Sequence, residues 1–180
     1  MRPDVPGGRI HSTDPFATPD EEKSAVRRLR GRLAAPVTLW TTTGPAGLTV
    51  SSMLVADGEP GRVLGLIDDE SDFWEAAEAN GRFAVTPLTP PDQQLADRFA
   101  GLMPAPGGLF AGGGWTETDY GPVPANAHTW AGCRLDSHRP CGWALLVEAV
   151  IETVHADPAP GRPLIHYRGR YHEATSRSAQ

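Results

Sequence analysis

Glycine and proline interrupt this sequence unusually often, and their frequency restricts the fold more than any other feature. The chain has 20 glycines and 18 prolines among 180 residues, about one residue in five, against about one in eight in an average protein. Closely spaced glycines and prolines disfavour long helices but suit short strands joined by turns. The sequence therefore predicts a β-rich rather than an all-helical protein.

Composition and charge limit the class of protein. Apolar residues make up 39% of the chain, which together with the glycines is normal for a globular domain with its own core. The formal net charge is −6, so nucleic acid is disfavoured as a partner. The longest apolar stretch, residues 143–151, is interrupted by Glu148 and is far too short to span a bilayer. We expect a cytoplasmic protein that binds neither nucleic acid nor membrane.

The expected organisation is a short arm followed by one domain. Residues 1–17 predict a flexible arm, and residues 18–175 predict a single folded domain without internal repeats. The first helix is expected to begin at Thr18, where Pro19 occupies the first helical position and Glu21 completes a capping box.

Turn residues divide the rest of the domain into short elements. Ser71 is expected to cap a helix over 71–80, and Gly81 to end it. Six or seven antiparallel strands favour a closed barrel, because closure hides the strand edges. The expected strands cover residues 37–43, 48–55, 62–67, 83–88, 130–135, 143–154 and 164–167, and a further helix covers 92–102.

Hydroxyl groups are concentrated in residues 47–52, which read Gly-Leu-Thr-Val-Ser-Ser. Thr49, Ser51 and Ser52 follow a glycine-containing turn and can donate hydrogen bonds to a phosphate or to the heteroatoms of a ring without adding charge. An ordinary strand rich in Ser and Thr has the same composition. These residues alone leave both interpretations open.

Several segments resemble, in their order and spacing, the flavin reductase-like family. The resemblance extends over roughly residues 30 to 172, and the order of the segments is more specific than any one motif. The segments are 36–43, 47–52, 63–67, 81–85, 95–101, 121–124 with Cys133, 146–150 and 163–171.

The resemblance implies a mainly β fold, an antiparallel split β-barrel with Greek-key order and a few short helices, that binds FMN or FAD. It also implies a homodimer with the flavin near the subunit interface. Many members reduce flavin with NAD(P)H, so the implied reaction is hydride transfer from nicotinamide to flavin for a partner monooxygenase or another acceptor.

The same resemblance implies which residues contact the flavin. Ser71 would hold the phosphate at the start of a helix, which is a favourable anion site. No residue is implied as a catalytic acid, and no metal is implied. The expected contacts are Thr49, Val50, Ser51 and Ser52 along the ring and its side chain, Phe83, Ala84 and Val85 along its edge, and Trp143 beside it.

Two replacements depart from the family pattern. Thr86 stands where many members have Asn, and Trp143 stands where many have the His of a Gly-Asp-His segment. An indole cannot ionise near neutral pH, so we expect flavin binding with slow NAD(P)H turnover. The alternative to a position beside the flavin is that the Trp143 side chain points into the barrel core. The functional alternative is a module that binds flavin, deazaflavin or haem with little turnover.

Negative charge lies close to the expected phosphate position. Asp68, Asp69 and Glu70 directly precede Ser71, so FMN is expected to bind less tightly than in typical members unless an arginine such as Arg82 or Arg98 compensates.

The cysteines indicate no standard metal or redox site. Cys133 and Cys141, even together with His138, match neither a CxxC pair nor a four-ligand zinc site.

Overall fold

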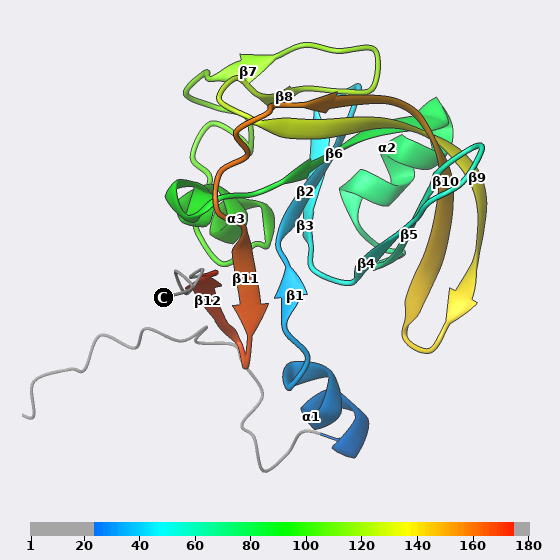
Figure 1. Ribbon diagram of the computed structural model, residues 1–180, viewed down its shortest axis with the longest axis vertical. Helices are drawn as coiled ribbons and strands as arrows, with labels where there is room; N and C mark the ends of the chain where they lie inside the picture. The colour runs from blue at the N-terminus through cyan, green and yellow to red at the C-terminus, as the bar shows by residue number, and fades with distance from the viewer. Residues whose placement is uncertain (1–23, 175–180) are drawn as a thin grey trace, which may run out of the picture.

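Seven antiparallel strands form one strongly curled sheet in the computed structural model, which describes residues 24–174. The strand order is β3-β2-β6-β9-β10-β5-β4 (Figure 1). The strands of this sheet are β2 (Thr38–Thr42), β3 (Ala46–Val50), β4 (Met53–Ala56), β5 (Arg62–Ile67), β6 (Arg82–Pro87), β9 (Thr129–Cys141) and β10 (Ala144–Ala156).

Two small sheets and four short helices complete the fold between residues 24 and 174. The helices are α1 (Ala25–Gly31), α2 (Asp72–Asn80), η1 (Pro90–Asp92) and α3 (Gln93–Phe99). One small sheet contains β1 (Ala35–Pro36), β11 (Leu164–Tyr167) and β12 (Arg170–Glu173), and the other contains β7 (Trp115–Thr116) and β8 (Val123–Pro124).

The sheet is curled because consecutive strands lie at its opposite edges. β3 pairs with β2 at one edge, and β4 pairs with β5 at the other. Only Ser51 and Ser52 connect β3 to β4, so the two edges must approach each other. The Leu66 N–H donates to the Ser52 carbonyl at 2.9 Å and joins the connection to β5. This arrangement confirms the predicted mainly β, antiparallel split barrel.

An aromatic core fills the concave side of the sheet. The Trp40 ring stacks on Phe83 with centroids 4.9 Å apart and meets the edge of Phe73 from α2 at 6.1 Å. All three side chains are fully buried. A Cβ at Gly65 would lie 2.5 Å from the Trp40 ring, so only glycine fits opposite this tryptophan.

Helix α2 lies against the concave side of the sheet, as Figure 1 shows. It buries Phe73, Trp74 and Ala77 in the core. The Ser71 hydroxyl caps its start, and Gly81 ends it in the left-handed conformation with φ 68°. Both ends confirm the sequence prediction for this helix.

A second, smaller core lies on the opposite face of β2. It joins Val37 and Leu39 to Phe99 of α3 and Leu164 of β11. The Tyr171 hydroxyl of β12 is hydrogen-bonded to the Asp97 carboxylate of α3. The C-terminal hairpin is thereby attached to the helix.

Three sequence predictions differ from the structure. The single strand expected over 48–55 is wrong, because the chain leaves the sheet at Ser51 and enters its other edge at Met53. The helix expected over 92–102 is shorter, since α3 covers only Gln93–Phe99 and follows the 3-10 turn η1. β9 and β10 extend further than expected and form one long hairpin of 13-residue strands.

The N-terminal predictions fall largely outside the described residues. The described helix begins at Ala25, where the Ser24 hydroxyl accepts a hydrogen bond from the Arg27 N–H at 3.1 Å. The expected cap at Thr18, with Pro19 and Glu21, lies outside the described residues, and so does the arm 1–17. The domain boundaries 18 and 175 stay predictions.

Candidate functional site

Ser51 and Ser52 lie where the chain passes from one sheet edge to the other. Both residues are half-buried. The Ser52 hydroxyl donates to the Leu66 carbonyl at 2.6 Å, so its lone pairs remain open to a further donor. The corner therefore presents two hydroxyl groups beside the end of β5.

Ser71 lies beyond the same end of β5, at the start of α2. Its hydroxyl donates to the Asp68 carbonyl at 2.7 Å and accepts from the Trp74 N–H at 3.2 Å. The first turn of an α-helix also holds N–H groups that the helix cannot satisfy internally, here those of Asp72 and Phe73. The serine corner and the helix start are thus the uncharged donors around this end of β5.

Carboxylates surround this helix start. Asp68, Asp69, Glu70 and Asp72 are all exposed. The Asp68 carboxylate accepts the Glu70 N–H at 3.0 Å and so stabilises the turn between β5 and α2. A phosphate bound here would meet favourable N–H dipoles and unfavourable charge together.

The other residues of the predicted strand segments are already engaged. The Thr49 hydroxyl donates to the Ala96 carbonyl of α3 at 2.8 Å. Val50 is buried in the barrel core. Phe83 and Val85 also point into this core, whereas Ala84 is buried on the opposite face. The structure does not bring these five side chains together with the serines at an open surface, and their contact with flavin stays a prediction.

Trp143 is the most exposed large hydrophobic side chain among the described residues, with a relative exposure of 105%. It occupies the two-residue turn of the β9–β10 hairpin, after Gly142 with φ 63°. A glycine with positive φ at the first turn position suits this tight hairpin. The alternative of a core position for Trp143 is therefore wrong.

Thr86 shows a feature that the sequence did not indicate. It is buried, with 2% exposure, and its hydroxyl has no hydrogen-bond partner among residues 24–174. Its register partner on β2 is Leu39, so the hydroxyl faces the second, apolar core.

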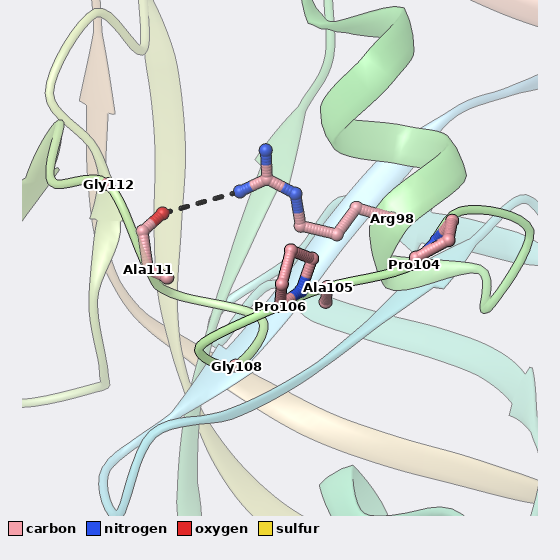
Figure 2. A pocket seen from close by; sticks show the side chains of 7 residues that line it. All are labelled: Arg98, Pro104, Ala105, Pro106, Gly108, Ala111 and Gly112. Atoms are coloured by element: carbon pink, nitrogen blue, oxygen red, sulfur yellow. Dashed lines mark hydrogen bonds between the residues drawn. The ribbon is translucent and has the colours of Figure 1, made fainter.

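Two cavities lie away from the predicted residues. The larger, about 410 Å³, lies between α2 and the β2–β3 turn and is also lined by Leu109. The smaller, about 260 Å³, contains Arg98 and the loop 104–112 (Figure 2). Neither is lined by one of the expected flavin contacts, but the smaller contains Arg98, which the sequence analysis named as a compensating charge near the phosphate.

The cysteines have no visible reactive role. Burial raises the pKa of the Cys133 thiol to about 12, and Cys141 is half-buried and also unpaired. His138 lies instead against α2, with Nε2 3.4 Å from a Glu78 carboxylate oxygen. Within the described part of the chain no group of three or more His, Cys, Asp or Glu residues could hold a metal ion.

The helices between Ser24 and Ala174 are all short, and none combines the length and apolar character needed to cross a membrane.

The curled barrel with a serine corner beside a helix start defines a class of protein. The family described as flavin reductase like domain matches residues 30–175. The chain belongs to this family, which confirms the resemblance seen in the sequence.

Relatives and solved structures agree with this assignment. The FMN reductase (NADH) RutF 2 of Methylorubrum extorquens is 33% identical over 171 residues, which cover 92% of this chain and 95% of the relative. The reductase subunit HsaB of a flavin-dependent monooxygenase from Mycobacterium tuberculosis is 31% identical over 150 residues, covering 81% and 79%. The crystal structure of a nitrilotriacetate monooxygenase component B homologue from Mycobacterium thermoresistibile has a TM-score of 0.76 at 29% identity, covering 86% of this chain and 89% of that one.

Proposed function

We propose that this protein is an NADH-dependent FMN reductase that supplies reduced flavin to a partner monooxygenase. The observation that carries the proposal is the similarity to the FMN reductase (NADH) of Methylorubrum extorquens, which extends over nearly the whole of both chains. The similarity to a monooxygenase reductase subunit supports the partner. Neither relative supports a haem- or deazaflavin-binding module.

The residues around the end of β5 fit the phosphate and ring of a flavin. Hydroxyl groups of Ser51 and Ser52 and the N–H groups at the start of α2 are uncharged donors, and a flavin presents oxygen and nitrogen acceptors to them. Ser71 would hold the phosphate, provided that its hydroxyl turns away from Asp68. The flavin contacts expected of the other strand residues stay predictions, because these side chains are buried or engaged within the fold: Thr49, Val50, Phe83, Ala84 and Val85.

The chain's part in the reaction is to bind and orient. When bound, flavin supplies the hydride-accepting ring, which is chemistry that side chains lack. Ser51 and Ser52 would fix the orientation of the ring, which lowers the entropic cost of aligning it with the nicotinamide. Trp143 would border the side from which the nicotinamide enters, where its large apolar face hinders that entry. This reaction needs no acid or base from the protein.

Dimerisation and location belong to the same proposal. We infer a homodimer in which a second copy lies beside the serine corner, because Leu54 and Leu66 of the adjoining strands are exposed. We also place the protein in the cytoplasm, where its two unpaired cysteines remain reduced.

The test is spectroscopic and kinetic. Purified protein is titrated with FMN while flavin fluorescence is followed, and NADH oxidation is then measured at the nicotinamide absorbance band with FMN in excess. FMN binding together with FMN-dependent NADH oxidation is the expected result. Binding without oxidation would instead support a flavin-binding module.

A further inference from the structure

A single arginine occupies the smaller of the two cavities. Figure 2 shows the Arg98 side chain extending from α3 over the loop 104–112, with its guanidinium directed towards Ala111. The cavity has a volume of about 260 Å³, and every other residue lining it is Pro, Ala or Gly. The guanidinium is thus the only charged group in the lining.

The Arg98 guanidinium makes only long, weak hydrogen bonds among residues 24–174. One guanidinium nitrogen lies 3.5 Å from the carbonyl oxygens of Leu109 and Ala111, which is beyond the normal range for a strong N–H···O bond. A guanidinium has five N–H donors. Within residues 24–174 no carboxylate lies at ion-pair distance from Arg98, whereas Arg62 contacts Asp136 at 2.6 Å.

The acidic residue nearest to Arg98 in the sequence, Asp97, is hydrogen-bonded to another residue. The Asp97 carboxylate is hydrogen-bonded to the Tyr171 hydroxyl, and its partial burial raises its pKa. From residue 98 to residue 116 the chain contains no acidic residue and no second basic one. In a chain of net charge −6, this stretch therefore carries one charge, and that charge is positive.

Two glycines with positive φ lie in the loop 104–112 beside the Arg98 guanidinium. Gly108 and Gly112 have φ values of 100° and 95°, a conformation that side-chain-bearing residues rarely adopt. A Cβ at either position would meet no atom within 4 Å. The positive φ values therefore account for glycine at both positions.

We propose that this cavity binds a phosphate of a second nucleotide, either the adenylate half of FAD or the nicotinamide dinucleotide. The inference rests on the proposed function, in which Ser71 takes the FMN phosphate. A guanidinium binds phosphate oxygens with two parallel hydrogen bonds, and the proline and alanine walls offer apolar contact to the attached ribose. The volume suits one phosphate and its sugar rather than a whole dinucleotide.

The test compares four nucleotides on Arg98→Gln and the wild-type protein. Dissociation constants for FMN and FAD come from flavin fluorescence, and those for NADH and NADPH come from calorimetry. We expect about tenfold weaker binding of FAD, NADH or NADPH, the scale of a lost charged hydrogen bond, with FMN unchanged. The nucleotide that weakens identifies the source of the phosphate.

Two further variants control this comparison. Arg98→Lys keeps the charge and should recover part of the affinity, while Arg170→Gln removes an exposed arginine of β12 and should change none of the four constants. Equal affinities of wild type and Arg98→Gln for FAD, NADH and NADPH would overturn the inference, as would an equal loss for all four nucleotides. A wild-type protein that binds NADH but no flavin would contradict the proposed function while leaving the Arg98 comparison intact.

Discussion

At the scale of single residues, Thr86 and Thr41 form a natural comparison. Both are buried threonines, on β6 and β2, with 2% and 1% exposure. The Thr41 hydroxyl donates to the Pro122 carbonyl at 2.7 Å, whereas the Thr86 hydroxyl has no partner among residues 24–174. A buried hydroxyl without a partner has lost its hydrogen bonds to water and gained nothing in exchange.

Thr86→Val is therefore expected to leave stability unchanged or raise the free energy of unfolding by about 1 kcal/mol, because a methyl group replaces an unpaired hydroxyl. Thr41→Val should lower it by about 1–3 kcal/mol, since the Pro122 carbonyl loses its donor. Urea denaturation of both variants measures the difference. Equal destabilisation would show that an internal water or a ligand satisfies Thr86.

Trp143 allows a functional test that stability does not confound. Its side chain is fully exposed, so Trp143→His should leave the melting temperature almost unchanged. Histidine can carry positive charge near neutral pH, and we expect it to increase NADH turnover by attracting the negatively charged nucleotide.

Stopped-flow and steady-state kinetics with NADH measure this effect, and Trp143→Phe serves as the control that removes the indole without adding charge. Phenylalanine should not increase turnover. A wild-type rate already at tens per second, which is ordinary for an enzyme, would contradict the expectation that Trp143 slows the reaction.

At the scale of elements, the start of α2 combines a structural and a binding role. The Ser71 hydroxyl accepts from the Trp74 N–H, a cap worth about 1 kcal/mol. Ser71→Ala should lower stability by that amount and weaken FMN binding by about 1–2 kcal/mol, the cost of a hydrogen bond lost to a charged phosphate.

Ser71→Thr is the control, because threonine keeps a hydroxyl for both the cap and the proposed phosphate and should retain stability and FMN affinity. Fluorescence titration gives FMN affinity, and thermal unfolding gives stability. Loss of stability in Ser71→Ala without loss of FMN affinity would remove Ser71 from the binding site and leave it only as a cap.

The same elements show what sequence patterns can predict. Arg62–Ile67 was predicted to the residue, and α2 with its cap Ser71 and its end Gly81 followed from local signals. The interruption of the strand at Ser51 and Ser52 could not be predicted from local signals, because both halves of 48–55 have strand character. Only the pairing of β3 and β4 with different partners shows where the chain changes edges.

The site was less predictable than the fold. Ser51, Ser52 and Ser71 lie near one end of β5, and their contact with flavin stays a prediction. The inward orientation of Phe83 and Val85 depends on packing against Trp40, which no local pattern contains. The sequence named Arg98 only as a compensating charge near the flavin phosphate, and the cavity around it became apparent from the structure.

At the scale of the whole molecule, the barrel exposes one apolar face. Strand alternation directs Val63 and Ile67 into the core, so the residues between them face outward. Leu54 and Leu66 are 72% and 38% exposed. The outward set is Leu54, Leu64, Leu66 and Leu146, contributed by β4, β5 and β10.

This leucine face predicts the dimer interface. The face has an apolar centre, and beside it lies a mixed-charge cluster of Arg62, Asp136 and Glu148. Such a surface is self-complementary, as a two-fold symmetric contact requires.

Light scattering should give twice the chain mass of 19.2 kDa. The double variant Leu54→Glu with Leu66→Glu should give the monomer mass, because opposed carboxylates would be buried without partners. Val154→Glu, at an exposed position near the other end of β10, should remain dimeric. A monomeric wild type at micromolar concentration, or a dimeric double variant, would contradict the prediction.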